Sequence, residues 1–168
     1  MSDLDLSERA IEAMMARLQN GNSVIDSINA ERAASNTNAV YPIPYPAQVL
    51  DSPPVRQMLN VFPTVAIIDG EIRFEDDQGF LATGLYEMTV AAYLQNSDPR
   101  ALAWQLRRYA QWMASVLLVG RNMDGGGWGV VLKGVSPGAR LQQSTPSGVQ
   151  GYMSWISVTI EIKDDQSL

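Results

Sequence analysis

The fold is decided by residues 84–118, which read GLYEMTVAAYLQNSDPRALAWQLRRYAQWMASVLL. In the first part, apolar residues alternate with mostly polar ones, which is typical of a strand with one buried face. Asp98 suits the N-cap of the helix that follows, because its carboxylate accepts a free backbone N–H. Pro99 suits the first helical position, where its missing donor has no partner to lose. The stretch therefore predicts a strand that leads into a long helix.

The predicted helix has a broad apolar stripe when it is drawn at about 100° per residue. We expect this stripe to be core, and its members are Leu102, Leu106, Tyr109, Ala110, Met113, Val116 and Leu117. Trp104 falls instead on the polar face, whose other members are Arg100, Arg107, Arg108 and Gln111. An aromatic side chain among arginines has the composition of an interface hot spot. The alternative is that an N-terminal helix folds over this face and packs on Trp104.

Further elements are predicted on both sides of this stretch. PTVAIIDG (63–70) is apolar on both faces and predicts a central strand, while WGVVLKGV (128–135) and the alternating WISVTIEIK (155–163) predict two more strands. LSERAIEAMMARLQNG (6–21) predicts a helix capped by Ser7 and stopped by Gly21, and residues 23–34 predict a second short helix. These elements predict an α+β fold, in which a mainly antiparallel sheet of about four strands packs against the long helix and the N-terminal helix.

Length and composition narrow the class of protein. The chain has 168 residues, of which 46% are hydrophobic, so we expect a single domain over 1–168. It has a net charge of −6 and no lysine- or arginine-rich block, which argues against specific DNA binding. The sequence has no apolar run of membrane-spanning length, and SDLDLSER at its start is not a signal-peptide pattern. We therefore expect a soluble protein that is made in the cytoplasm.

The sequence contains neither cysteine nor histidine. This excludes Cys/His zinc sites, disulfides and catalytic triads, and we expect no catalytic residue, cofactor or metal. Carboxylate chemistry is the remaining enzymatic alternative. Its densest candidate is Glu75, Asp76 and Asp77, for which a solvated turn is the main interpretation and metal binding the alternative. The run DGGGWG (124–129) predicts a loop that enters a strand, because the lysine and the strand-to-helix context of a phosphate loop are missing.

Two segments lack regular patterns. Residues 35–62 form a proline-rich extended arm in which Tyr41 and Tyr45 alternate with prolines. We expect this arm to lie against a neighbouring subunit or partner ring, because an extended segment does not satisfy its own backbone. An exposed flexible loop is the alternative. Residues 136–151, SPGARLQQSTPSGVQG, predict a long mobile loop that orders on docking, or a plain hairpin loop.

The order of helix, long excursion, two strands, long helix and two strands resembles that of bacteriophage tail terminator and tail completion proteins. The resemblance is carried by SERAIEAMMARLQ, PTVAIID, YEMTVAAYLQNSDPRALAWQLRRYAQWMASVL and SWISVTIEI. It rests on element order and hydrophobic spacing. The long proline-rich arm and the segment 136–151 leave open whether the chain resembles the terminator itself or a neighbouring neck protein of the head-tail joint.

The resemblance implies a structural virion protein that forms a hexameric ring at the tail-neck junction. Such a ring caps the tail tube, stops its elongation and contacts the head-neck connector protein, while DNA passes through the lumen without specific binding. For this sequence we expect contacts at Trp104, Arg100, Arg107 and Arg108, with the acidic segment Glu75–Asp77 as a complementary mate and Tyr41 and Tyr45 in the arm. The alternatives are a small-ligand-binding or regulatory module and, least favoured, an enzyme that uses Asp124 or the acids of FEDD.

Overall fold

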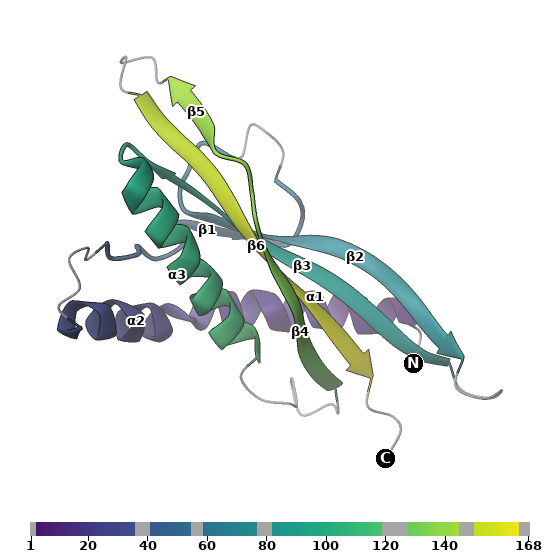
Figure 1. Cartoon of the computed structure of the whole chain (residues 1–168). Coiled ribbons are helices and arrows are strands. Elements are labelled where there is room, and N and C mark those ends of the chain that lie inside the picture. The colour runs from purple at the N-terminus through teal and green to yellow at the C-terminus, as the bar shows by residue number, and fades with distance from the viewer. Residues whose placement is uncertain are drawn as a thin grey trace.

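The computed structural model describes residues 3–35, 41–54, 59–76, 82–118, 128–144 and 150–164. Their elements follow one another in the order α1 (Asp3–Asn20), α2 (Asn22–Ala34), β1 (Gln48–Leu50), β2 (Thr64–Asp76), β3 (Ala82–Asn96), α3 (Pro99–Leu118), β4 (Trp128–Pro137), β5 (Leu141–Ser144) and β6 (Gln150–Asp164). Figure 1 shows the helices on one side of a single sheet. The predicted α+β class is confirmed.

The sheet has six strands in the order β1-β2-β3-β6-β4, and β5 pairs with β6 beyond the end of β4. The pairs β2–β3, β3–β6 and β6–β4 are antiparallel, whereas β1 runs parallel to β2. These four long strands are the ones that the sequence predicts. The last of them in the chain, β6, lies in the interior of the sheet between β3 and β4.

Two short strands correct the sequence-based interpretation. β1 has only three residues and follows prolines, so its pattern is too short to predict a strand. β5 lies inside 136–151, which was predicted to be a long loop, and β4 also extends into that segment as far as Pro137. The loop prediction was therefore wrong for 136–137, 141–144 and 150–151. Residues 141–144 are rich in polar residues, and they become a strand because β6 supplies a ladder of hydrogen-bonding partners.

All three helices lie on one side of the sheet, and α1 passes behind the strands in Figure 1. α3 contacts β3, β6 and β4, while α1 and α2 pack on α3. Between these layers lies a single core, with Met14 and Leu18 from α1, Ile25 from α2, and Met88 and Val158 from the sheet among its members. The side of α3 that faces away from the sheet is therefore also partly buried.

This two-sided packing explains where the predicted stripe of α3 was incomplete. Six of its seven members are buried, and Leu106 is partly buried. Trp112, which lies outside the predicted stripe, is fully buried. Its indole N–H donates to the carbonyl of Gly21 at 2.9 Å, and its ring packs edge-on against Tyr109 at 5.5 Å. The α1–α2 pair therefore widens the buried face of α3 beyond one stripe.

The ends of the helices follow local chemistry. Asp98 caps α3, because its Oδ1 accepts the N–H of Arg100 at 2.8 Å, as predicted. Gly21 separates α1 from α2, also as predicted, and a Cβ there would lie 2.8 Å from Cγ1 of Val116. α1 begins at Asp3 rather than at the predicted cap Ser7, and its sequence starts with acidic residues that favour a helix N-terminus.

Candidate interaction surfaces

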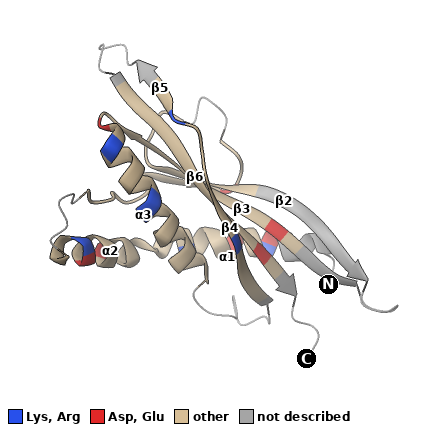
Figure 2. Ribbon diagram, viewed as in Figure 1, with Lys and Arg blue, Asp and Glu red and all other residues tan. Residues whose placement is uncertain are grey.

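The exposed side of α3 carries the aromatic residue that the sequence singles out. Trp104 is 39% exposed, and Cζ of Arg107 lies 5.0 Å from the centroid of its ring, which is a cation–π arrangement. Arg100 and Gln111 are exposed on the same side of the helix. We call these four residues the Trp104 surface. In Figure 2, basic residues mark α3, while acidic residues mark the strands toward the other end of the sheet.

Arg108 does not belong to the Trp104 surface, although it was predicted there. It is only 4% exposed, and its guanidinium donates a hydrogen bond to the carbonyl of Tyr41. Burial, followed by the nearby charge of Arg32, lowers the pKa of Arg108 below its ordinary value. The prediction failed because position 108 borders the polar arc of α3, and residues 41–46 lie across it. Arg108 therefore holds the chain's own proline-rich segment.

That segment is fastened to the helices at several backbone atoms. The amide of Asn29 binds both backbone groups of Ile43, accepting its N–H at 2.9 Å and donating to its carbonyl at 3.0 Å. Gln105 donates to the carbonyl of Pro42 at 2.9 Å, and the hydroxyl of Tyr109 donates to that of Pro44 at 2.5 Å. The side chain of Ile43 is 2% exposed and belongs to the core.

These contacts change the interpretation of the arm. We predicted that its backbone needs a partner chain, and for 41–44 that premise was wrong, because side chains of α2 and α3 supply the partners. Tyr45 is 48% exposed, and its hydroxyl donates to Asp26 at 2.5 Å. This hydrogen bond is the first cause that raises the pKa of Tyr45, followed by desolvation and the charge of Asp26. Contacts of Tyr41 and Tyr45 with another subunit stay a prediction.

The acidic segment lies far from the Trp104 surface within one molecule. Glu75 pairs with Thr83 and Asp76 with Ala82 at the end of the β2–β3 ladder, so the predicted turn was wrong for these two residues. Asp77 lies outside the described residues, as do residues 124–127 of the glycine run, including Asp124. Figure 1 shows this end of the sheet at the opposite side of the molecule from the start of α3. A contact between the two surfaces therefore requires two copies of the chain.

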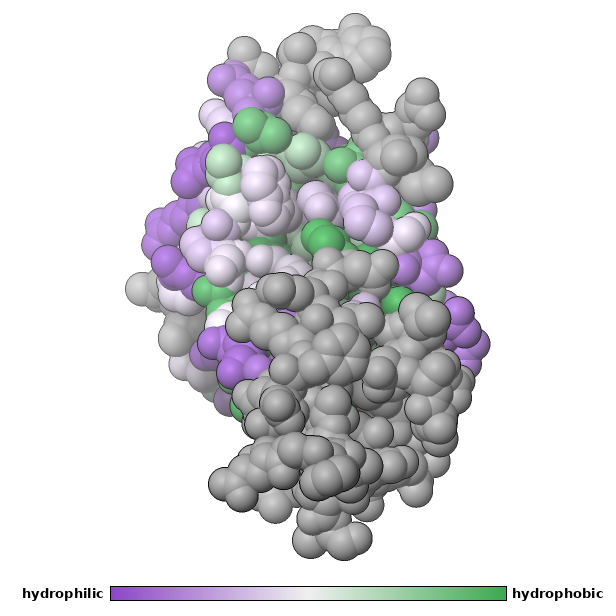
Figure 3. Space-filling model, turned by 90° about the vertical axis from the view of Figure 1, so that its right-hand side faces the viewer, coloured by the Kyte–Doolittle hydropathy of each residue, from purple (hydrophilic) through white to green (hydrophobic). Residues whose placement is uncertain are grey.

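The side of the sheet that faces away from the helices is a second exposed surface. We call it the bare face, because no described helix covers it. Polar side chains of β3, β6 and β4 meet on it, as the alternation predicts: the hydroxyls of Thr89 and Thr159 lie 3.2 Å apart, and Lys133 forms an ion pair with Glu161 at 2.9 Å. The same face also carries the rings of Tyr93 and Trp155, whose centroids are 6.3 Å apart. Figure 3, which views the molecule from the right-hand side of Figure 1, shows described residues of intermediate hydropathy interspersed with hydrophobic ones, and hydrophilic residues at the margins.

A third surface was not predicted. Val131, Leu132 and Val135 of β4 are 39–46% exposed, and among the described strands only β6 pairs with β4. We call these three residues the β4 edge. The signal in the sequence is the consecutive run Val130, Val131 and Leu132, which places apolar side chains on both faces of one strand. That pattern fits a central strand, whereas β4 lies at the border of the sheet.

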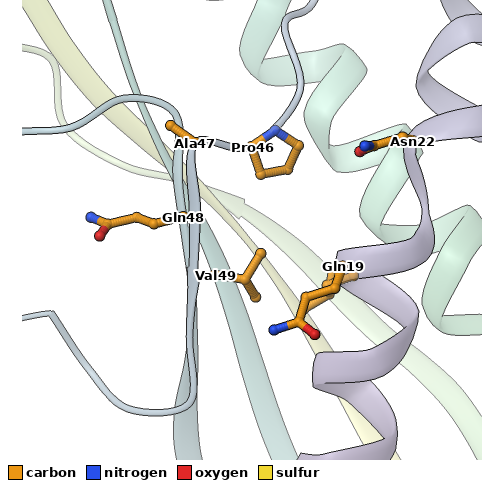
Figure 4. Close-up of a pocket in the computed structure, with 7 residues that line it drawn as sticks. Gln19, Asn22, Pro46, Ala47, Gln48 and Val49 are labelled. Atoms are coloured by element: carbon orange, nitrogen blue, oxygen red, sulfur yellow. The ribbon is translucent and has the colours of Figure 1, made fainter.

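An open surface hollow of about 350 Å³ is lined by Arg17, Asn20, Gly21, Val24 and Val116, whereas two other cavities are smaller and have no ionisable side chain in their lining. Figure 4 shows one between the α1–α2 junction and β1, with a volume of about 200 Å³. Its polar lining consists of Gln19, Asn22 and Gln48. A second cavity of about 220 Å³ lies between Pro44, Phe62 and Gln105. Both are smaller than the usual range of ligand pockets, roughly 300–1,000 Å³.

Searches for related proteins return no match: no protein-family model fits the sequence, and no curated protein is significantly similar to it. The described residues contain no group of three acidic side chains placed to hold a metal ion. None of the described helices combines the length and the apolar character needed to cross a membrane. The features of the described residues that bear on function are therefore the exposed surfaces.

Proposed function

We propose that this chain is a structural subunit of a bacteriophage tail, similar to tail terminators: a hexameric ring at the tail-neck junction that caps the tail tube and meets the head-neck connector. The observation that carries the proposal is the Trp104 surface. An exposed indole stacked with Arg107 is the composition of a protein interface, and it stands out on a chain of net charge −6. In this proposal the chain is not an enzyme, and it is located in the virion.

The partner of the Trp104 surface is acidic in this proposal. Arg100 and Arg107 supply positive charge beside the indole, so a carboxylate-bearing surface complements them. Within a ring, the acidic mate is the segment Glu75–Asp77 of the neighbouring copy. Outside the ring, it belongs to the tail tube or connector protein. Both arrangements use different patches on the two partners, as head-to-tail assembly requires.

The acidic residues of the bare face are compatible with the proposed passage of DNA through the lumen of the ring. Glu87 and Glu161 lie directly opposite each other on β3 and β6. Lys133 forms an ion pair with Glu161. Carboxylates repel phosphates, so a lumen that carries them lets DNA slide without binding. The alternative, a small-ligand-binding module, gains no support from the two cavities of about 200 Å³, and the 350 Å³ hollow is open, with its one charged side chain, Arg17, donating to the carbonyl of Leu117.

The experiment combines tail tubes with the purified chain. Electron microscopy of tubes assembled with the wild-type chain is expected to show tubes that end in a ring and stop growing. Trp104→Ala is expected to weaken assembly by about 2 kcal/mol, or roughly 30-fold, because it removes the centre of the contact. Its thermal unfolding is expected to stay close to that of the wild type, since Trp104 is substantially exposed.

Analytical ultracentrifugation of the same variant identifies the mate. A lost ring fraction assigns the contact to the neighbouring copy, and capping lost from intact rings assigns it to the tube or connector. Ser27→Ala, on the exposed side of α2 and outside the Trp104 surface, is the control, and we expect it to assemble normally. A large loss of monomer stability with unchanged assembly would place Trp104 in the core and contradict the proposal.

A further inference from the structure

We propose that β4 of one copy pairs antiparallel with β2 of the next copy, so that the sheets of successive copies join into one continuous sheet. This inference rests on the proposed ring and names the contact between its subunits. It is carried by two open strand edges of one sheet, by their lengths and directions, and by the aliphatic side chains that one of them exposes.

The first open edge is β4. Val135 pairs with Val158 and Leu132 with Ile160, and both partners on β6 are fully buried on the core side of the sheet. Leu132 and Val135 therefore lie in the same apolar layer as the core, but they are 39% and 46% exposed because the layer ends at β4. An edge strand with apolar side chains and free backbone groups is a template for another strand.

The usual protection of such an edge is weak here. A charged side chain that projects past the edge discourages pairing, and Lys133 is the lysine available on β4. Its Nζ lies 2.9 Å from a carboxylate oxygen of Glu161 on the adjacent strand, so its charge is held over the sheet rather than beyond the edge. The irregularity between Leu132 and Gly134 bends β4, but no described strand covers its outer side.

The second open edge is β2. This strand has 13 residues, and β1 pairs with only three of them, Thr64, Val65 and Ala66. Along residues 67–76, the described strands pair with β2 on the β3 side alone. The uncovered part of β2 thus matches β4, which has 10 residues, in length.

The directions of the two edges also match. Each step from β2 to β3, from β3 to β6 and from β6 to β4 is antiparallel, so β4 runs opposite to β2. A second copy in the same orientation therefore presents its β2 antiparallel to β4 of the first, and the alternation continues across the junction. Pairing of β4 with β4 would leave both β2 edges open, whereas the head-to-tail contact uses both edges and closes in a ring. The Trp104 surface lies on the helix layer, outside this contact, so in this arrangement its acidic partner is the tail tube or connector protein and not the neighbouring copy.

The test uses the absence of cysteine from the chain. Single cysteines are introduced as Val131→Cys on β4 and, in separate chains, as Ile68→Cys or Arg73→Cys on β2. Two positions on β2 allow for sliding of one edge along the other. A short bis-maleimide is added to each variant alone and to mixtures. We expect a crosslinked dimer when Val131→Cys is mixed with a β2 variant, and none when any variant is treated alone.

Ser27→Cys, on the exposed side of α2, is the control and is expected to give no dimer with Val131→Cys. Strong crosslinking of Val131→Cys alone would overturn the proposal in favour of a two-fold contact between β4 strands. Capping of tail tubes without crosslinks in the mixtures would also overturn it, while the proposed function would stand. Crosslinks in the mixtures without capping would support the strand contact and reject the tail function. A chain that stays monomeric with and without tubes would reject both.

Discussion

The proline-rich segment 41–47 and strand β4 make opposite use of an unpaired backbone. The segment has no strand partner along residues 41–46, yet side chains of α2 and α3 bind its carbonyls and the N–H of Ile43. β4 pairs with β6 along its length except at the irregularity between Leu132 and Gly134, yet its other side is open among the described strands. The irregular segment thus finds its backbone hydrogen-bonding partners within the chain, while one edge of strand β4 finds none among the described strands. Backbone satisfaction depends on neighbours in space and not on the regularity of the segment.

The largest effect that sharpens this comparison is expected at Ile43. Ile43→Ala removes a core side chain that is 2% exposed and should lower the free energy of unfolding by about 3 kcal/mol. Val135→Ala is the matched control, because it shortens an aliphatic side chain that is 46% exposed and should cost under about 1 kcal/mol. Urea unfolding of both variants gives the two values. Equal losses would mean that the segment is no better anchored than the edge.

A smaller effect is expected from Tyr109→Phe, which removes the hydroxyl bonded to Pro44 and should cost about 1 kcal/mol at neutral pH. Burial raises the pKa of Tyr109 above its ordinary value of about 10. The folded state therefore keeps a proton that the unfolded state loses, and stability falls as the pH rises above about 10. Urea unfolding between about pH 8 and pH 11 should show a shallower decline for Tyr109→Phe than for the wild type. Identical slopes would mean that this hydroxyl does not fasten the segment.

The smallest effect on the monomer is expected from Leu132→Thr, which keeps a residue suited to strands at the open edge. Because Leu132 is 39% exposed, we expect its replacement to change the free energy of unfolding by no more than about 1 kcal/mol. The same variant should reduce crosslinking between Val131→Cys and the β2 cysteines, since it removes apolar surface from the contact. A steep loss of monomer stability would show that Leu132 belongs to the core.

The parts of the fold that sequence predicts are those decided locally. Asp98 and Pro99 mark the start of α3 because capping depends on adjacent residues, and the alternation through Met88 and Val90 reports one buried face of β3. The burial of Trp112 was missed, and the exposure predicted for Arg108 was wrong. The burial of both residues depends on α1, α2 and residues 41–46, which pack on α3 from distant parts of the chain.

The candidate surfaces divide in the same way. The exposure of Trp104 follows from its place on the helix, so the sequence predicts it. The sequence does not predict the exposure of the β4 edge, because the run of Val130, Val131 and Leu132 has the same pattern in a central strand as in a border strand. Only the strand order separates these cases, and that order is fixed by β6, which enters between β3 and β4.

The interior position of β6 has a consequence for synthesis on the ribosome. The ladder partners of β6 on β3 and β4 are made first, and neither strand pairs directly with the other. The indole of Trp112 likewise donates to the carbonyl of Gly21, 91 residues earlier, so α1 and α2 have no packing partner on α3 until α3 has been made. Until residues 150–164 leave the exit tunnel, the nascent chain has the apolar side chains of three helices but only the β2–β3 half of the sheet to bury them. Folding of the sheet is therefore delayed until β6 has been made, and a chaperone that shields apolar surface can act on the nascent chain until then.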